Sequence, residues 1–335
     1  RAIVKTKYLT LKMVFISGVG RTGTGILRRA LSRHNNILTL KNNLRFLIDP
    51  DGIIPFCKIL SSNWTPYQFD QSIKRLEKVL KGFSRKNKII FNIQNIIRAV
   101  GLDKFSNYKI FPRYSNFDLV SLCPKYPQLV DNLIDQLKLF DFKGEWEGMP
   151  LLKKKTLYFG HPKKEKKITK LFSDFIINVL SNTKTKKDVR CFVDANIWNH
   201  LWFNEIVKFF PKAKLIHIQR NPMDVVASLM HQNWSPKDVE QAAKFYRAIM
   251  QEWWKVKLTI PRNTYMEIKL EDLTSKPKET FRDICNFTSL PFDKKILGED
   301  LSKSNHGRWK KDIPKKSITN VKKILRLCLD KQGYK

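Results

Sequence analysis

The sequence predicts an α/β protein in which helices flank a parallel sheet and a long helical insertion interrupts the pattern. Two observations favour this fold class. Short apolar runs suited to buried strands alternate with amphipathic stretches suited to helices, and between about residues 61 and 185 this alternation gives way to segments of helical period. Strands separated by helices pair in parallel through right-handed crossovers, so we expect one sheet whose strands end along a common edge.

The first unit of the pattern, MVFISGVGRTGTGILRRALSRH, spans residues 13–34. The apolar run from Met13 to Ile16 predicts a strand, and apolar residues at helical spacing after Thr24 predict a helix. The glycines between them would let the backbone turn its N–H groups inward, toward the positive end of the helix dipole. This loop therefore predicts a binding site for a phosphate or sulfate group.

A second strand is predicted at residues 37–40, and the turn sequence DPDG at residues 49–52 closes the unit. Residues between that strand and the turn would lie at the carboxyl edge of the sheet, where open α/β folds bind their ligands. Asn43 and Arg45 are therefore candidate site residues.

The insertion between about residues 61 and 185 contains amphipathic segments joined by aromatic, proline-containing connections, and we find no internal repeat in it. It is either a cap that binds an acceptor or additional core. Further strands are predicted at residues 189–194, 214–219 and 265–270, with helices at 201–210, 223–231 and 236–258. We interpret residues 1–335 as a single domain that contains the insertion.

The formal net charge is +34, from 64 Lys and Arg against 30 Asp and Glu. This charge predicts non-specific binding of polyanions, although AT-rich codon bias explains an excess of lysine equally well. The lysines are scattered, and base-reading proteins usually interleave arginines with aromatic residues, so we expect no specific recognition of nucleic acid.

The five cysteines are far apart and form no CxxC pair, which predicts buried thiols and no metal site. No apolar run reaches the length of a membrane span, so we expect none in this chain. The chain opens on Arg1 and contains two glycosylation sequons. These features leave two localisations open, a cytoplasmic enzyme or the lumenal domain of an anchored one.

The first loop matches part of a Walker A pattern, because Gly18 and Gly23 have the spacing of G-x-x-x-x-G. Thr24 and Gly25 follow where that pattern requires Lys and Ser or Thr. An ordinary ATPase or nucleotide kinase needs this lysine on the β- and γ-phosphates, so its absence argues against both classes. The cation of this loop is Arg21.

Four motifs together resemble the sulfotransferases that use 3′-phosphoadenosine-5′-phosphosulfate. They are GVGRTGTG, QRNPMDVVAS, YMEIKLEDL and HGRWKKDIP, in that family's order and spanning residues 13 to about 314. The branch that includes the tyrosylprotein sulfotransferases is the most similar. The resemblance implies a P-loop-NTPase-like core, transfer of a sulfuryl group to a hydroxyl or less commonly an amine, the product 3′,5′-adenosine bisphosphate, and no metal.

The resemblance also implies which residues bind the nucleotide. The first loop would hold the 5′-phosphosulfate through Gly20, Arg21, Thr22, Gly23, Thr24 and Gly25. Arg220 and Ser228 would meet on the 3′-phosphate. The segment that closes over the nucleotide would contribute Gly307, Arg308 and Trp309, with His306 and Lys310 as weaker candidates. Glu271 and Asp272 correspond to a structural turn of the family, and we assign them no catalytic role.

In the tyrosylprotein branch, a Glu-Thr-Arg triplet after the second strand supplies the general base and an arginine that assists the transferring group. This chain has Asn43-Leu44-Arg45. Arg45 matches the arginine, but the amide of Asn43 cannot accept a proton at neutral pH. Three explanations stay open: an inactivating substitution; another base such as Asp49, Asp194, His34 or His200; or a protein that binds nucleotide and polyanions without turnover. An acidic peptide or anionic glycan suits the basic surface as acceptor.

Overall fold

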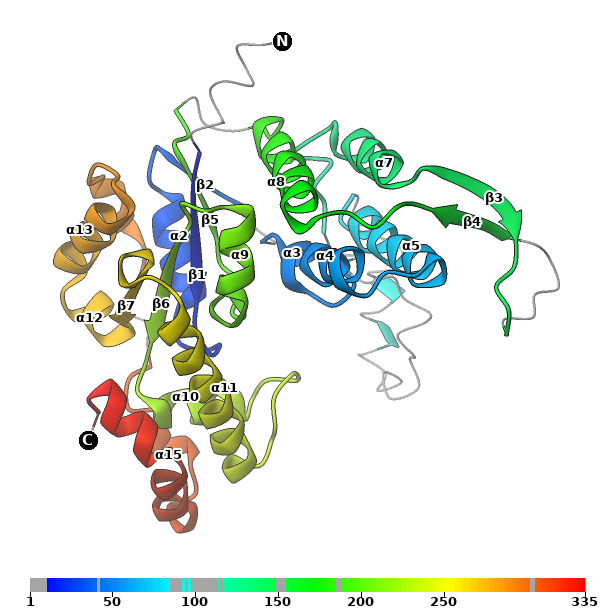
Figure 1. Ribbon diagram of the computed structural model, residues 1–335. Coiled ribbons are helices and arrows are strands. Elements are labelled where there is room, and N and C mark those ends of the chain that lie inside the picture. Colours follow the sequence, from blue (N-terminus) through cyan, green and yellow to red (C-terminus); the bar gives the residue numbers. More distant parts are fainter. Residues whose placement is uncertain are drawn as a thin grey trace. The chain divides into compact units, whose positions relative to one another are not determined.

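A parallel sheet of five strands forms the centre of the molecule's largest compact unit (Figure 1). We describe a computed structural model at residues 11–40, 43–84, 92–93, 96–97, 114, 117–148, 155–184, 188–301 and 305–334. The described residues divide into two units. The sheet unit lies within residues 10–43 and 186–335, and the helical unit lies within residues 44–185.

The sheet has the order β2-β5-β1-β6-β7, and every neighbouring pair of strands is parallel. This arrangement confirms the predicted parallel sheet. Because β1 lies in the middle, its residues 13–17 are all buried, as expected of a strand covered on both faces. The strands are β1 (Lys12–Ser17), β2 (Ile37–Thr39), β5 (Cys191–Asp194), β6 (Lys214–Gln219) and β7 (Tyr265–Lys269).

Helices cover both faces of the sheet. On one face, Val14 and Ile16 of β1 pack in a core cluster with Leu27 and Phe281, which belong to α2 (Thr24–Ser32) and α13 (Pro277–Thr288). On the other face lie α9 (Phe203–Phe209) and α11 (Val239–Thr259). The remaining helical elements of this unit are η2 (Asn199–Trp202), α10 (Pro222–Leu229), η3 (Arg262–Thr264), α12 (Leu270–Ser275), η4 (Lys294–Gly298), α14 (Trp309–Asp312), η6 (Lys315–Ser317) and α15 (Ile318–Gln332).

The helical unit has an aromatic core, in which Phe46, Phe56, Phe69, Phe83 and Phe172 are fully buried. Its helices are α3 (Arg45–Ile48), α4 (Ile53–Ser62), α5 (Pro66–Gly82), α7 (Tyr126–Leu137) and α8 (Glu165–Ser181). The predicted helical insertion lies within this unit. The prediction of a single domain over residues 1–335 stays a prediction.

The helical unit also contains an antiparallel pair of strands that the sequence did not predict, β3 (Phe140–Gly144) and β4 (Lys155–Phe159). Most side chains of β3 are exposed on both faces. Its sequence, FDFKG, alternates apolar and polar residues over only a short run, within a region whose other segments have helical period, so its strand signal is weak.

All five cysteines lie in the described part of the chain, where they are buried and form no disulfide. Among the described residues, no helix is both long and apolar enough to cross a membrane.

Candidate anion-binding site

The loop between β1 and α2 presents backbone N–H groups at the carboxyl edge of the sheet. The helix starts after Gly23, whose φ of 104° suits glycine, and its first hydrogen bond runs from Leu27 N to Gly23 O at 3.0 Å. A Cβ on Gly23 would lie 2.7 Å from a methyl group of Leu270. Within the described residues, nothing accepts a hydrogen bond from the N–H groups of Thr24 and Gly25. These donors are therefore available to an anion.

Two further residues of the loop are held tightly. Gly20 has a φ of 87° and lies against the ring of Trp234, where a Cβ would come within 2.7 Å of that ring. Thr22 is 1% exposed, and its buried hydroxyl oxygen has no hydrogen-bond partner among the described residues. A buried hydroxyl without a partner is unfavourable, which is consistent with a ligand that completes its bonding.

Three arginines from distant parts of the sequence converge beside this loop. Arg21 Nε donates to Ser228 Oγ at 2.9 Å, and Arg308 Nη1 donates to the same oxygen at 3.3 Å. Arg220 donates from Nη1 to Arg21 O at 3.2 Å and from Nη2 to Asn305 O at 2.6 Å. The Nε atom of Arg220 is buried and has no hydrogen-bond partner in the described part of the chain. The predicted pair, Arg220 and Ser228, thus shares one site with Arg21 and Arg308.

Three guanidinium groups lie close together at this site, although Asp312 pairs with Arg308 and Asp224 lies 3.8 Å from Arg220. Burial lowers the pKa of Arg21, and the nearby charge of Arg308 lowers it further. Burial also lowers the pKa of Arg220, as do Arg308 and Arg21, while Asp224 and Glu271 act in the opposite direction. Guanidinium groups that repel one another at close range are stabilised by an anion placed between them.

These arginines line a cavity of about 500 Å³. Two acidic residues line it, Glu299 and Asp300, and Glu299 is paired, because it accepts from Arg29 at 2.6 Å and from Arg33 at 3.3 Å. We call it the arginine cavity. It is lined by Arg21, Gly23, Thr24, Gly25, Ile26, Arg29, Arg220, Ser228, Leu270, Glu299, Asp300, Asn305 and Arg308.

Asp224 holds the C-terminal segment that carries Arg308, and the sequence analysis missed it. This carboxylate is 2% exposed and accepts from Gly307 N at 2.8 Å and from Trp309 N at 3.0 Å. It also lies 3.8 Å from Arg220. The signal was present in the sequence, since an acid four residues after Arg220 lies in the first turn of α10.

The other predicted residues of this segment have contacts of their own. The amides of Gly307 and Trp309 are used by Asp224, and Lys322 lies 5.6 Å from the centre of the Trp309 ring. Lys310 is exposed. His306 shares a hydrogen bond of 2.8 Å with Thr274. Arg308 is thus the residue of this segment whose side chain reaches the arginine cavity.

The residues proposed around the general base fall in both units. In the sheet unit, Asn43 Nδ2 donates to Ala195 O at 3.0 Å, beyond the end of β5, and its buried Oδ1 has no partner. Asn43 also adopts a φ of 56°, a left-handed conformation that Asn tolerates well. In the helical unit, Arg45 Nε donates to Asp49 at 2.9 Å, and Tyr114 donates to the same carboxylate at 2.7 Å.

The alternative bases are bound in structural roles. Asp194 is 1% exposed and accepts from Asn199 at 2.9 Å. Both ring nitrogens of His34 are hydrogen-bonded, one to Pro291 O and one to Asn36 N. His200 is fully buried beside Ser17, 2.5 Å from its hydroxyl, and burial followed by the charge of His217 keeps its pKa well below the usual value.

Among the described residues, no group of three or more His, Cys, Asp and Glu side chains is arranged to hold a metal ion. The fold and the arginine cavity together define a protein that binds a phosphate- or sulfate-bearing ligand at the carboxyl edge of a parallel sheet. The chain belongs to the sulfotransferase family, whose sequence model matches residues 120–294, about half of the chain. This match includes Arg220 and Ser228 and confirms the family inferred from the four motifs. The tyrosylprotein branch stays a prediction.

Individual proteins similar to this chain include two solved structures, of which the first supports the fold. A sulfotransferase domain from the curacin biosynthetic pathway has a TM-score of 0.50 with 13% identity, over 97% of this chain and 98% of that one. A sulfotransferase domain from the Synechococcus PCC 7002 olefin synthase scores 0.43 with 13% identity, over 92% and 82%. An uncharacterized protein of Aquifex aeolicus (strain VF5) is 30% identical over 151 residues, which are 42% of this chain and 18% of that protein. The chain therefore spans less than a fifth of that relative's length.

Proposed function

We propose that the protein transfers a sulfuryl group from 3′-phosphoadenosine-5′-phosphosulfate to a hydroxyl or, less commonly, an amine acceptor. The observation that carries this proposal is that Arg21 and Arg308 both donate to Ser228 while Arg220 donates to the backbone of Arg21, beside a loop of available N–H groups. Family membership supports the reaction class. The donor carries two phosphate groups, which matches a site with more cationic groups than one monoanion needs.

The residues of the arginine cavity fit this nucleotide. Two buried polar atoms, Thr22 Oγ1 and Arg220 Nε, lack partners, and both can donate to a phosphate oxygen. We assign the 5′-phosphosulfate to the loop of residues 20–25 and the 3′-phosphate to Arg220, Ser228 and Arg308. Because Arg21 donates to Ser228, it lies where the two parts of the site adjoin.

The bound donor supplies the sulfuryl group and a phosphate leaving group, in an in-line transfer analogous to phosphoryl transfer. Arg21 and the N–H groups of Thr24 and Gly25 stabilise negative charge at the phosphate as the bond to sulfur breaks. A preorganised donor of this kind lowers a barrier by about 3 to 4 kcal/mol. Guanidinium and N–H groups provide the positive charge in this proposal, which therefore includes no metal.

The nucleotide assignment is tested by thermal unfolding with 3′,5′-adenosine bisphosphate. At about 100 times its Kd, a ligand that binds only the folded state adds about 2.7 kcal/mol to the free energy of unfolding. We expect stabilisation of the native protein and of Arg326→Ala, a control whose side chain is 86% exposed on α15. We expect little in Arg220→Ala. No stabilisation of the native protein at a saturating concentration would overturn the proposal.

A second candidate function is nucleotide binding without turnover, and Asn43 favours it. The Nδ2 of Asn43 is used as a donor to Ala195, and an amide oxygen is no base at neutral pH. A donor-turnover assay on the native chain and on Asn43→Glu separates the two functions. General base assistance is worth roughly 10² to 10⁴ in rate, so a gain of that size places the base at position 43. Equal, measurable turnover in both proteins places it elsewhere, and no turnover in either supports the second function.

The acceptor belongs to the same proposal. The net charge of +34 favours an acidic peptide or an anionic glycan, and it also favours non-specific polyanion binding. Non-specific binding weakens steeply as salt rises, whereas a true acceptor raises turnover. Donor turnover measured with sulfated glycan, acidic peptide and no addition, at low and at physiological salt, separates an acceptor from a bound polyanion.

A further inference from the structure

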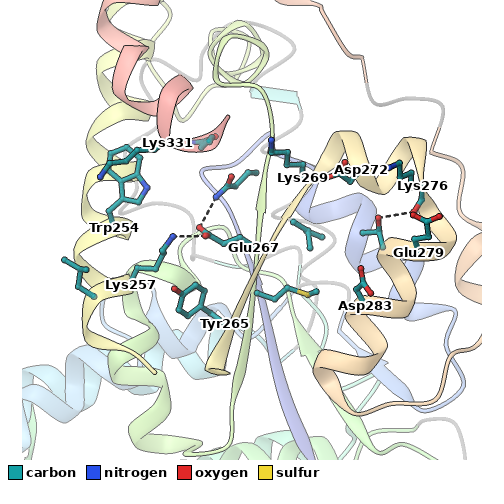
Figure 2. A pocket seen from close by; sticks show the side chains of 16 residues that line it. Trp254, Lys257, Tyr265, Glu267, Lys269, Asp272, Lys276, Glu279, Asp283 and Lys331 are labelled. Atoms are coloured by element: carbon teal, nitrogen blue, oxygen red, sulfur yellow. Dashed lines mark hydrogen bonds and ion pairs between the residues drawn. The ribbon is translucent and has the colours of Figure 1, made fainter. Parts of the chain in front are cut away.

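A second cavity of the sheet unit lies beside β7 and has no role in the proposed transfer (Figure 2). Its volume is about 770 Å³, larger than the arginine cavity. All five residues of β7 line it, together with residues of α11, α12, α13 and the end of α15. We call it the edge cavity.

The floor of the edge cavity is the open edge of the central sheet. β7 is the last strand in the sheet order and pairs with β6 alone. On its other side, Arg262 donates to Tyr265 O at 3.0 Å, but no backbone among the described residues pairs with this edge. An edge strand with available N–H and C=O groups is a template for an added strand.

The wall formed by α11 is largely apolar once its charges are paired. Lys257 donates to Glu267 at 2.7 Å, and Lys331 lies over the ring of Trp254 at 4.3 Å (Figure 2). Beside them, the side chain of Leu258 is 87% exposed. Leu258 and the Trp254 ring therefore offer contacts to apolar side chains.

The opposite wall, formed by α12 and α13, is acidic. Asp272, Glu279 and Asp283 are exposed there, and none forms an ion pair with a described residue. Lys276 is the cation that lines this wall. The lining of the whole cavity is balanced, with four lysines, Lys257, Lys269, Lys276 and Lys331, and four carboxylates, but three of the carboxylates lie on this wall. Such a local grouping is unusual in a chain with 64 cationic and 30 acidic residues. This wall therefore favours cationic side chains.

We propose that the edge cavity binds an extended segment of a partner protein as a sixth strand of the sheet. Successive side chains of a strand point to opposite faces, so one set faces α11 and the other faces α12 and α13. The segment consequently has Lys or Arg at alternate positions, opposite Asp272, Glu279 and Asp283, and apolar residues between them, against Leu258 and Trp254.

A second copy of this chain suits the cavity less well. Two copies would pair their β7 strands antiparallel around a twofold axis perpendicular to the sheet. Each helical wall of one copy would then lie next to the same wall of the other copy. The acidic wall would then face another acidic wall, which is unfavourable. The overall charge of +34 also disfavours the binding of a basic segment to the surface in general, so an acidic wall is the place that would attract it.

The test uses a labelled peptide, acetyl-Lys-Val-Lys-Val-Lys-Val-Lys-amide, whose binding to the whole chain is measured by fluorescence anisotropy. We expect saturable binding that weakens at least about tenfold in Glu279→Lys/Asp283→Lys. The matched control is Glu252→Lys, an exposed residue of α11 outside the cavity. We expect it to bind as the native chain does. The milder variant Glu279→Gln/Asp283→Asn keeps the test valid if the lysine variant unfolds, and it should weaken binding in the same direction.

Two modified peptides test the strand itself. N-methylation of either all lysines or all valines removes the N–H groups from one edge of the peptide, so one of the two peptides should lose at least about tenfold in affinity. A peptide with glutamate in place of lysine should bind to Glu279→Lys/Asp283→Lys more tightly than the lysine peptide binds to this variant. The proposal would be overturned if no saturable binding were found, or if the lysine variant bound the peptide with the affinity of the native chain. It would also be overturned if both N-methylated peptides kept full affinity, or if the chain formed a dimer that the peptide dissociates.

Discussion

The two cavities of the sheet unit differ in how they are built. The arginine cavity joins residues from four distant segments through side-chain hydrogen bonds, such as Arg21 to Ser228 and Arg308 to Ser228. The edge cavity is formed by elements that are mostly consecutive in the chain, β7, α12 and α13, together with α11 and the end of α15. A preorganised set of buried donors suits catalysis, whereas an open strand edge with exposed charges suits docking.

Charge distinguishes the two cavities in an unexpected way. In a chain with net charge +34, cationic side chains alone would not identify a nucleotide site. Burial, mutual hydrogen bonding and the unpartnered Arg220 Nε identify it instead. In the edge cavity the informative feature is the reverse, a gathering of carboxylates that departs from the composition of the chain. In this chain, a group of side chains that departs from the overall composition indicates a binding site better than the net charge does.

The largest expected effect is that of Arg21→Ala in the arginine cavity. Removal of a donor to the leaving phosphate should lower kcat by roughly 10² to 10³, because such a donor acts on charge that develops in the transition state. Steady-state sulfuryl transfer measures this effect, with Arg326→Ala as the control. A decrease of less than about threefold would contradict the assignment of Arg21 to the reacting phosphate.

The next effect concerns Asp224, which orders the segment carrying Arg308. Asp224→Asn keeps the shape but loses one acceptor for the amides of Gly307 and Trp309, and an unsatisfied buried donor costs about 1 to 3 kcal/mol. We expect affinity for 3′,5′-adenosine bisphosphate to fall by roughly tenfold, and affinity for adenosine 5′-monophosphate to fall much less.

Calorimetric titration of both nucleotides measures this ratio. The matched control is Asp330→Asn, an exposed acid on α15. A uniform loss of affinity for both nucleotides would show that Asp224 acts on general stability and not on the 3′-phosphate side of the site.

The third effect concerns His200 and His217, which are buried beside Trp253. Burial, then the charge of Lys257, lowers the pKa of His217 from 6.5 to about 3. The unfolded chain therefore binds a proton on this ring below about pH 6.5, whereas the folded chain does so near pH 3. Stability conferred by the neutral ring is complete above pH 6.5 and decreases by about 1.4 kcal/mol per pH unit as pH falls toward 3.

His217→Phe removes this dependence, since both ring nitrogens of His217 lack hydrogen-bond partners and its ring stacks on Trp253 at 4.8 Å. Between pH 6.5 and 4, we expect the free energy of unfolding to decrease less in His217→Phe than in the native chain. The difference should equal the contribution of about one proton taken up on unfolding. Denaturant titrations at several pH values measure it. An unchanged slope would mean that His217 is protonated in the folded chain.

The smallest expected effect is the energetic coupling of the two cavities. They share no lining residue, so saturation with 3′,5′-adenosine bisphosphate should change the Kd of the basic peptide by less than about twofold. Anisotropy titrations with and without the nucleotide measure the coupling. A larger change in either direction would show that the docking of a partner regulates the nucleotide site.

Much of the fold was predictable because its signals are local. The strands at residues 191–194, 214–219 and 265–269 and the helices that follow the first two lie within a few residues of their predicted bounds, whereas α12 and α13, which follow the third, were not predicted. The strands β3 and β4 were missed, because they are short and lie in a region whose other segments have helical period. The site residues Arg21, Arg220, Ser228 and Arg308 were named in advance, and the structure brings them into one cavity.

The sequence by itself determined where the strands of the central sheet lie along the chain, the anion-binding loop and the residue types at the site. Periodicity, glycine spacing and motif order are properties of the linear chain. Only the tertiary structure decided that Arg21 shares Ser228 with Arg308, that Asp224 holds the segment of residues 307–309, and that β7 is the open edge. These relations join residues that are far apart in the chain, or depend on which strand has a single neighbour, and both follow from packing.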